Sequence, residues 1–344
     1  MRIGIIGTGR IASRFAETAF TGIQSTSINC VYNPNIESAE RFCAAHNIKC
    51  YTNNLEAFLD NIDAAYIASP HETHYEYSLF LLNNGKHVLC EKPAALSARE
   101  TKELYETAST KGLVFMEAVK TAYCPGFHAM MELARSGKIG RIVDVEAAFS
   151  RLTPVNTREY SAPVYNGSFL EFGSYVMLPV FRLLGCDYSN VTFSSVRAQN
   201  GVDAYTKAYF SYGDKLASVK TGLGVKTEGQ LLISGTNGYI LAKSPWWLTK
   251  EFEVRYENPN KREVYNYAYD GSGLQYELRA FIRAASRAER AEEPDGISWE
   301  TEALTGADDM SVADVGLTDC ESIAMARTME AFLKWNEPEM KKRQ

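Results

Sequence analysis

The sequence predicts an α/β protein in which an N-terminal doubly wound parallel sheet precedes an α+β domain with a large, mostly antiparallel sheet. Short β-branched or apolar runs alternate with helix-like stretches from Arg2 to about Val119, which is the signature of a parallel sheet with crossover helices. After about Pro125 the strands alternate polar and apolar residues between turn pairs, as antiparallel hairpins do. We therefore expect one domain at residues 1–120 and another at 121–344, with a C-terminal helix that can return to the first.

The first domain has five expected strands with helices between them. Asn83-Asn84-Gly85 closes one helix in the manner of a left-handed C-cap, and Ser97 with Glu100 opens another as a capping box. The expected strands are residues 3–6, 28–32, 64–68, 87–90 and 114–116.

The second domain has strands joined by the hairpin turns Gly213-Asp214 and Asn237-Gly238. Helix-like segments are expected to cover one face of its sheet and to leave the other face for a partner, so a dimer or a dimer of dimers through this sheet is predicted. The expected strands are 143–149, 191–198 and 204–212, and the expected helices are 169–184, 275–287 and 318–334.

Composition excludes several classes of partner. The 344 residues carry a formal net charge of -6, so no basic footprint for nucleic acid is present, and no apolar run is long enough for a membrane span. The seven cysteines are scattered without a Cys-x-x-Cys pair. That pattern favours reduced thiols and a cytoplasmic location over a disulfide framework.

A glycine-rich turn lies between the first strand and the first helix. It fits the Gly-x-Gly-x-x-Ala pattern, whose glycines let a pyrophosphate approach a helix N-terminus. The alternative is an ordinary tight turn, in which Arg10 is solvated and pairs with no cofactor phosphate. The residues predicted to bind the dinucleotide here are Gly7, Thr8, Gly9, Arg10 and Ile11.

The end of the second strand usually decides between the two nicotinamide cofactors. A carboxylate there accepts from the ribose hydroxyls, and an arginine accommodates the extra phosphate. This chain has Asn33, whose amide can hydrogen-bond either group, so the cofactor is NAD or NADP with NAD favoured.

Three further segments carry a family resemblance. Ala68-Ser69-Pro70 with His74, the run from Gly85 to Glu91-Lys92-Pro93, and Met116-Glu117-Ala118 follow the glycine pattern in order. In this the chain resembles the glucose-fructose oxidoreductase and inositol dehydrogenase family (Gfo/Idh/MocA). The resemblance implies a Rossmann domain, hydride transfer on sugar or polyol hydroxyls, and a cofactor site that includes Ser69, Pro70, His74, Glu91 and Lys92.

Lys92 is the first catalytic candidate. It follows a buried strand, at the sheet edge where open α/β sheets bind ligands. Oxidising an alcohol removes a proton together with the hydride, so a positioned base is needed, and desolvation near a nicotinium charge would lower the pKa of a lysine. The alternative is a structural lysine paired with Glu91.

Tyr175 is the second catalytic candidate. Its segment, Gly167 to Tyr175, resembles the second signature of the family, in the branch similar to dihydrodiol dehydrogenase that uses a tyrosine and lysine pair as proton donor. Glu171 lies one helical turn earlier on the same face, and Pro179 is expected to kink the helix. The alternative is a core or interface tyrosine.

Two positions depart from the family pattern and leave the substrate open. Glu171 stands where aspartate is usual, and Lys120 follows a strand where many members carry other side chains. Both are predicted to contact substrate, although Lys120 can equally cap the strand.

His71 and His74 are three residues apart, which does not suit a zincin helix, so no metal is expected. The paired Trp246 and Trp247 are interpreted as core or dimer contacts before ligand contacts.

The sequence therefore predicts a cytoplasmic NAD(P)-dependent oxidoreductase of a small-molecule sugar, sugar derivative or diol. One alternative is a redox-neutral NAD-dependent glycoside hydrolase. The other is a non-catalytic dinucleotide-binding sensor, since a fold alone does not establish catalysis.

Overall fold

A computed structural model describes residues 1–24, 26–161, 165–291 and 316–341. The described chain forms two compact units. The first comprises Met1–Ala94, Glu100–Tyr123 and Gly271–Leu317, and the second Ala95–Arg99, Cys124–Asp270 and Thr318–Gln344.

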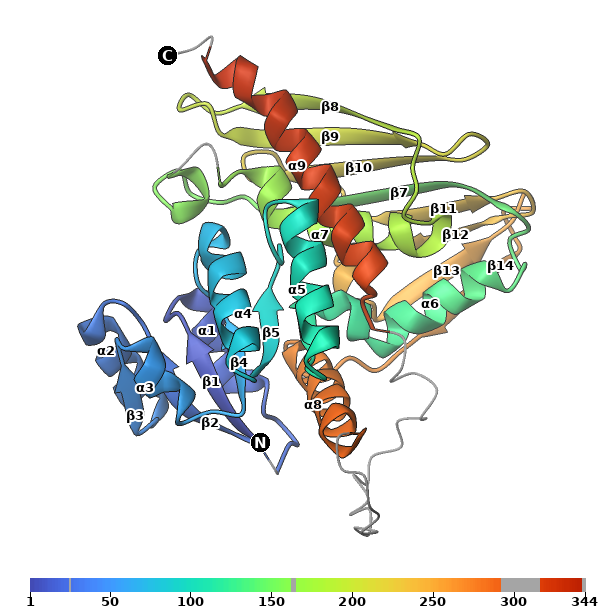
Figure 1. Cartoon of the computed structure of the whole chain (residues 1–344). Helices are drawn as coiled ribbons and strands as arrows, with labels where there is room; N and C mark the ends of the chain where they lie inside the picture. The colour runs from blue at the N-terminus through green and yellow to red at the C-terminus, as the bar shows by residue number, and fades with distance from the viewer. Residues whose placement is uncertain (25, 162–164, 292–315, 342–344) are drawn as a thin grey trace. The chain divides into compact units, whose positions relative to one another are not determined.

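The first unit contains a six-stranded parallel sheet in the order β3-β2-β1-β4-β5-β6 (Figure 1). Apolar residues fill both faces of its central strands because helices cover both sides. The strands are β1 (Arg2–Ile6), β2 (Ser27–Tyr32), β3 (Cys50–Thr52), β4 (Ala64–Ile67), β5 (His87–Glu91) and β6 (Phe115–Ala118). The helices are α1 (Arg10–Thr18), α2 (Ile36–His46), α3 (Leu55–Leu59), α4 (His74–Asn83) and α5 (Ala98–Thr110), with short 3-10 turns η1 (His71–Thr73) and η2 (Lys120–Tyr123).

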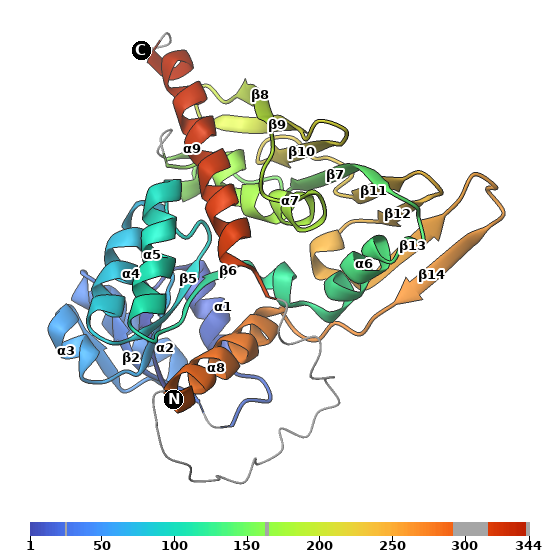
Figure 2. The same ribbon diagram turned by 45° about the vertical axis from the view of Figure 1, so that its right-hand side comes forward.

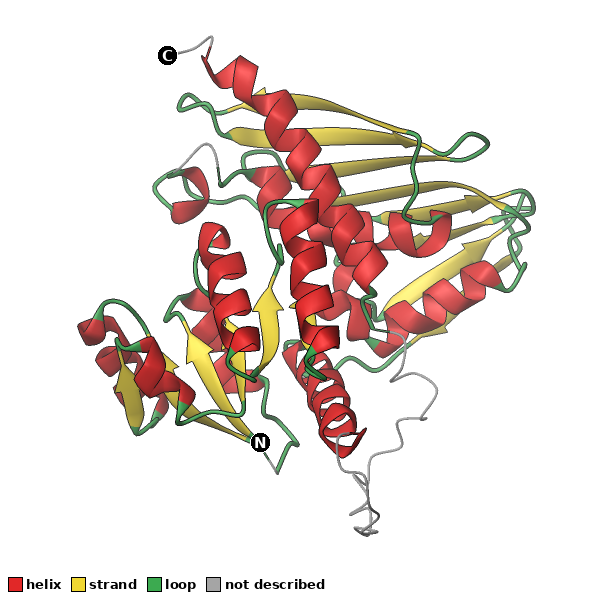
Figure 3. Cartoon of the chain, in the orientation of Figure 1, coloured by secondary structure: helices red, strands yellow, loops and turns green. Residues whose placement is uncertain are grey.

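The second unit contains an eight-stranded sheet in the order β14-β13-β12-β11-β7-β10-β9-β8. Only the β7 and β10 pair is parallel. The strands, drawn yellow in Figure 3, are β7 (Ile142–Ser150), β8 (Asn190–Arg197), β9 (Asp203–Ser211), β10 (Leu216–Gly222), β11 (Leu231–Gly235), β12 (Tyr239–Ala242), β13 (Glu251–Arg255) and β14 (Arg262–Asn266). The predicted fold class, a doubly wound parallel sheet with a mostly antiparallel partner domain, is confirmed.

Helices cover one face of the eight-stranded sheet. The long helix α7 (Ser168–Leu184) packs on β7, β10 and β9, and α9 (Asp319–Lys341) packs on α7 and β8 (Figures 1 and 2). The remaining elements are α6 (Pro125–Arg135), η3 (Arg158–Tyr160) and η4 (Trp246–Leu248). Helix α7 runs through Pro179 to Leu184.

One predicted helix lies in a different unit from the one expected. The helix α8 (Leu274–Ala291) forms where it was predicted, but it belongs to the first unit. Arg279 donates to the carbonyl oxygen of Thr21, 3.2 Å away, just beyond α1. The expectation that this helix covers the second sheet is therefore wrong, because its apolar stripe packs against α1 and η2.

A disulfide is a second correction. Cys30 and Cys50 are joined across β2 and β3, where the parallel register places them opposite one another. The expectation that all seven cysteines are reduced does not hold for this pair, and the other five form no disulfide.

Candidate active site

The glycine-rich turn of the first unit packs against the loop that follows β4. Gly7 has a φ of +101°, which L side chains rarely adopt. A Cβ at this position would lie 2.6 Å from the carbonyl oxygen of Ala68 and 3.0 Å from the nitrogen of Ser69. The turn and the Ser69 loop, both predicted to bind cofactor, are therefore in direct contact.

The N-terminus of α1 is open in front of Gly9. This glycine is the N-cap of the helix, and no heavy atom lies within 4 Å of the position that its Cβ would occupy. The first N–H groups of a helix attract an anion, and the exposed Arg10 adds a positive charge beside them. The turn therefore fits the pyrophosphate of a dinucleotide.

Asn33 lies next to this turn. Its Nδ2 donates to Oγ1 of Thr8, 2.8 Å away, and its Oδ1 accepts from the backbone nitrogen of Asn35. The end of β2 and the glycine turn thus meet at two residues that were both predicted to bind the cofactor. The position that usually selects the cofactor with a carboxylate or an arginine therefore holds a neutral amide in this chain.

His74 links the cofactor loop to the Glu91-Lys92-Pro93 turn. Its imidazole is fully buried, with Nδ1 lying 2.7 Å from the carbonyl oxygen of Pro93 and Nε2 lying 3.0 Å from that of Ser69. One ring therefore bridges the loops after β4 and β5. His74 was predicted to belong to the cofactor site, and its contact with Pro93 was not foreseen.

Glu91 is a buried carboxylate directly before Lys92. The hydroxyl of Tyr66, on the neighbouring strand β4, donates to Oε1 of Glu91 at 2.6 Å. Burial raises the pKa of Glu91, while the positive charges of Lys92 and Lys120 and the Tyr66 hydrogen bond oppose the rise. Sequence reasoning missed Tyr66, because only the β4 and β5 register brings it to Glu91.

A second carboxylate supports the turn from the other side. Oε1 of Glu117, a buried residue of β6, accepts from the backbone nitrogen of Ala94 at 3.1 Å. Sequence reasoning quoted Glu117 as part of a family motif but gave it no role. Strands β4, β5 and β6 thus each contribute a side chain that fixes the backbone around Lys92.

Lys120 is engaged by the segment before α8. Its Nζ donates to the carbonyl oxygen of Ser272 at 2.7 Å, and the Ser272 hydroxyl lies 2.6 Å from that of Thr18. Nearby, both carboxylate oxygens of Glu277 are buried without a hydrogen-bond partner among the described residues. Burial raises the pKa of Glu277 well above its usual range; the charge of Glu91 adds to the rise and that of Lys120 opposes it.

The second unit presents Glu171 and Tyr175 from α7. Oε1 of the buried Glu171 accepts from Nη2 of Arg158 at 3.1 Å. Tyr175 stacks on Phe149 of β7, with their ring centroids 5.1 Å apart. The expectation that Glu171 and Tyr175 lie near one another on one helix agrees with α7.

Further aromatic rings surround Phe149. The ring of Trp247 stacks on it at 3.8 Å, and that of Phe172 at 4.5 Å. Trp246, in contrast, is buried in the core and donates from Nε1 to the carbonyl oxygen of Ala148. Sequence reasoning missed Phe149 and Trp247 as neighbours of Tyr175, since they come from strands and turns far apart in the chain.

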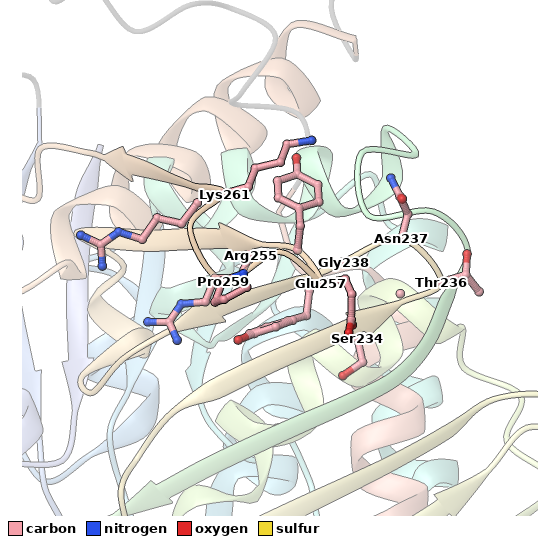
Figure 4. Close-up of a pocket in the computed structure, with 12 residues that line it drawn as sticks. Ser234, Thr236, Asn237, Gly238, Arg255, Glu257, Pro259 and Lys261 are labelled. Atoms are coloured by element: carbon pink, nitrogen blue, oxygen red, sulfur yellow. The ribbon is translucent and has the colours of Figure 1, made fainter.

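The cavity in Figure 4 lies elsewhere in the second unit. It measures about 760 Å³ and is lined by the turn between β11 and β12 and by the hairpin of β13 and β14, including Asn237, Arg255 and Lys261. None of the predicted site residues lines it. Over the ranges that the structure describes, no three His, Cys, Asp or Glu side chains form a metal site, and no described helix has the length and apolarity needed to cross a membrane.

Comparisons with known proteins agree with this architecture. The family described as "Oxidoreductase family, NAD-binding Rossmann fold" matches residues 1–119, and the "GFO/IDH/MocA C-terminal domain" matches residues 127–241. The chain belongs to the Gfo/Idh/MocA family of oxidoreductases. As a member, it is an NAD(P)-dependent dehydrogenase or reductase that acts on CH–OH groups.

Several individual relatives are similar over much of their length. Scyllo-inositol 2-dehydrogenase (NADP(+)) IolU of Bacillus subtilis (strain 168) is 34% identical over 62% of this chain and 66% of its own. Trans-1,2-dihydrobenzene-1,2-diol dehydrogenase of Xenopus laevis is 29% identical over 80% of this chain and 86% of its own.

Two solved structures share the fold. A 3-ketoreductase from Actinomadura kijaniata, KijD10, in complex with NADP and TDP-benzene, has a TM-score of 0.75 at 20% identity, covering 96% of both chains. Levoglucosan dehydrogenase, in complex with NADH and levoglucosan, has a TM-score of 0.75 at 17% identity, covering 98% of both chains.

Proposed function

We propose that this enzyme transfers a hydride between NAD(P) and a ring-borne CH–OH carbon of a polyol, sugar derivative or diol, with Lys92 and Tyr175 handling the proton. The observation that carries the proposal is the hydrogen-bonded frame around Lys92. His74, Glu91 and Glu117 all fix the backbone that presents this lysine at the end of β5. Such support is typical of a group whose position determines a reaction rate.

The bound cofactor would supply the hydride acceptor or donor. We infer that it is held by the turn of Gly7, Thr8, Gly9, Arg10 and Ile11, by Asn33, and by the loop of Ser69 and Pro70. The neutral Asn33 favours NAD but accommodates either cofactor, because an amide can pair with a hydroxyl or with a phosphate oxygen.

Tyr175 would exchange the proton of the substrate hydroxyl, with Lys92 stabilising the phenolate. Glu171 would accept hydrogen bonds from neighbouring hydroxyls while its pairing with Arg158 holds it in place. The rings of Phe149, Phe172 and Trp247 beside Tyr175 offer an apolar wall against which a cyclic substrate can pack. This arrangement favours cyclic diols and polyols.

Lys120 has a role in this proposal that is separate from the proton transfer. Its Nζ donates to the Ser272 carbonyl oxygen in the first unit. We propose that a substrate oxygen either replaces this carbonyl or accepts a further hydrogen bond from Nζ. The division into a cofactor part at residues 1–120 and a substrate and dimerisation part at 121–344 remains our proposal for how the roles are shared.

We propose a homodimer, or a dimer of dimers, formed through the open face of the eight-stranded sheet. Phe193 of β8 faces the helices, since it contacts Phe169 and Phe332. Val196 points to the opposite face by strand parity, and it is 60% exposed. Such exposed apolar side chains favour a partner sheet. A cytoplasmic location is proposed with it, supported by the five cysteines that form no disulfide.

The test is nicotinamide absorbance with purified protein, NAD or NADP, and scyllo-inositol, trans-1,2-dihydrobenzene-1,2-diol or levoglucosan as substrate. Lys92→Ala is run alongside, and cofactor affinity is measured by fluorescence. We expect turnover to fall by about 10²- to 10⁴-fold in the variant with cofactor affinity retained. Unchanged turnover would refute Lys92 as a catalytic residue. Tight cofactor binding without turnover on any substrate would favour the redox-neutral hydrolase or the sensor.

A further inference from the structure

A buried carboxylate lies at the start of the helix that carries Glu171 and Tyr175. Asp203, the first residue of β9, is 1% exposed. Its Oδ2 accepts from the backbone nitrogen of Phe169 at 2.9 Å, from Oγ of Ser168 at 2.7 Å and from Oγ1 of Thr206 at 2.7 Å. Its Oδ1 has no hydrogen-bond partner among the described residues. Two of these donors belong to the first turn of α7.

Gly167 makes room for this carboxylate. It is the N-cap of α7 with a φ of +114°, and a Cβ there would lie 1.8 Å from Oδ1 of Asp203. A glycine N-cap has no side chain that could accept a hydrogen bond from the free N–H groups of the first turn. The acceptor comes instead from a strand 36 residues further along the chain.

The helix start determines where the site residues point. Glu171 lies in the first turn, and its backbone nitrogen donates to the carbonyl oxygen of Gly167. Tyr175 follows one turn later on the same face. A rotation or fraying of the first turn would therefore move both side chains, whereas residues further along α7 are held by packing on β7, β10 and α9.

We propose that Asp203 is a positioning residue for the reaction: its negative charge fixes the first turn of α7, and thereby the direction in which Glu171 and Tyr175 project, without contacting the substrate. This inference rests on the proposed function for its kinetic consequence, but its structural part can be tested without cofactor or substrate.

The ionisation of Asp203 falls in an accessible range. Burial raises its pKa to about 6, while the hydrogen bonds from Ser168, Thr206 and Phe169 and the charge of Arg197 oppose the rise. The titratable and charged groups that face it are Arg197 of β8 and Tyr160 of η3, whose own pKa is raised by burial and by Asp203. The cap is therefore charged above about pH 6 and neutral below it.

The way in which Asp203 changes the free energy of unfolding with pH distinguishes a positioning role from a stabilising role. Because the pKa of Asp203 is raised in the folded state, the stability that this group contributes is present at low pH and is lost as the pH rises through the folded pKa. A carboxylate whose charge stabilised the fold would have a lowered pKa, and its contribution to the free energy of unfolding would increase as the pH rises. The neutral Asp203→Asn variant should thus gain stability relative to the wild type between pH 5 and pH 8, yet lose activity at pH 8.

The experiment places 3-fluorotyrosine at Tyr175 and follows its fluorine resonance by NMR from pH 4.5 to 7.5, with thermal unfolding on the same samples. We expect the wild-type resonance to titrate with a midpoint near 6 and the Asp203→Asn resonance to stay constant. Gly167→Ala, which displaces the carboxylate sterically but keeps its charge, should shift the resonance at every pH. The matched control is Asn54→Ala, which removes a cap from α3, where Oδ1 of Asn54 accepts from the nitrogen of Ala57.

Activity at pH 8 is then measured with the substrate that the wild type turns over. We expect kcat to fall about tenfold in Asp203→Asn with KM for cofactor unchanged, and no change in Asn54→Ala. A titration that persists in Asp203→Asn, or equal wild-type and variant kcat, would overturn the proposal. Should the wild type turn over none of the substrates while its Tyr175 resonance still titrates through Asp203, the proposed function fails and the positioning role stands.

Discussion

The hydroxyl of Tyr66 donates a 2.6 Å hydrogen bond to the buried carboxylate of Glu91, the residue directly before Lys92. The ring of Tyr66 also stacks on Phe15 of α1, with centroids 3.7 Å apart. The helix that begins at the glycine turn and the strand that ends at Glu91, just before Lys92, are therefore joined through one tyrosine.

Tyr66→Phe should destabilise the protein and change its pH dependence. The variant keeps the ring but leaves a buried carboxylate with one donor fewer, which costs about 1–3 kcal/mol of the free energy of unfolding. The pKa of Glu91 should rise further, since this hydrogen bond now lowers it. Urea unfolding and the pH profile of turnover measure both effects. Tyr51→Phe is the control, because its hydroxyl bonds Glu40 at the exposed surface, and equal losses in the two variants would contradict the argument.

Gly7→Ala should weaken cofactor binding. Its Cβ would meet the Ala68 carbonyl oxygen at 2.6 Å, so the turn and the Ser69 loop must separate. We expect the affinity for NADH, measured by fluorescence, to fall by about tenfold or more, or 1.4 kcal/mol. Gly85→Ala shares a positive φ of +70° but has no atom within 4 Å. This control variant introduces the backbone strain without the steric clash, and we expect its affinity for NADH to equal that of the wild type.

Substitutions of His74 should separate its two contacts. Asn places a donor near the position of Nδ1 and Gln near that of Nε2, so each variant keeps one of the two polar contacts. We expect His74→Asn, which keeps the Pro93 contact, to weaken mainly cofactor binding. His74→Gln, which keeps the Ser69 contact, should lower mainly kcat. Identical kinetic changes in both variants would show that the ring acts only by filling space.

Tyr175→Phe should lower turnover by about 10²- to 10⁴-fold while the protein stays folded. The phenyl ring retains the stacking on Phe149, so thermal stability should hardly change. Tyr209→Phe, on β9 of the same unit, is the control for loss of a tyrosine hydroxyl. Loss of folding in Tyr175→Phe would instead support a structural role for its hydroxyl.

Glu277→Gln should flatten the decline of stability with pH. The folded-state pKa of Glu277 is raised well above its usual range by burial, so the stability it contributes is present at low pH and is lost as the pH rises. The wild type should therefore lose free energy of unfolding between pH 5 and pH 8, and the variant should lose less of it. Denaturant titrations at both pH values give the comparison, and a steeper decline in the variant would contradict the assignment.

Local patterns in the sequence were sufficient for most of the secondary structure. The runs expected at 28–32 and 87–90 are strands β2 and β5, and the turn pairs at 213–214 and 237–238 join antiparallel strands. Strand β3 was missed, because Cys50-Tyr51-Thr52 is too short to show alternation. The stripe of α8 predicted a helix correctly, but a helical period does not say which sheet the helix packs on.

Some residues of the candidate site could not be predicted from the sequence, because they are brought together by long-range contacts. The pairing of Cys30 with Cys50 depends on the β2 and β3 register, and the contact of Asp203 with Phe169 depends on how β9 lies under α7. The family motifs identified Lys92 and Glu117 because those residues are adjacent to recognisable segments. Asp203 and Tyr66 have no such neighbours, and only the folded chain brings them to the residues they support.

The first unit is assembled from three separated stretches of chain, and this has a consequence for biosynthesis. All six strands of its sheet lie within the first 118 residues, but α8, which follows shortly after the Ser272 that contacts Lys120 and Thr18, begins at Leu274. At a translation rate of about 5–20 residues per second, α8 leaves the ribosome roughly 8–30 seconds after the last strand. During that interval α1 and the η2 turn lack the helix that packs against them, so a chaperone that shields the apolar surface left exposed there has a defined window in which to act.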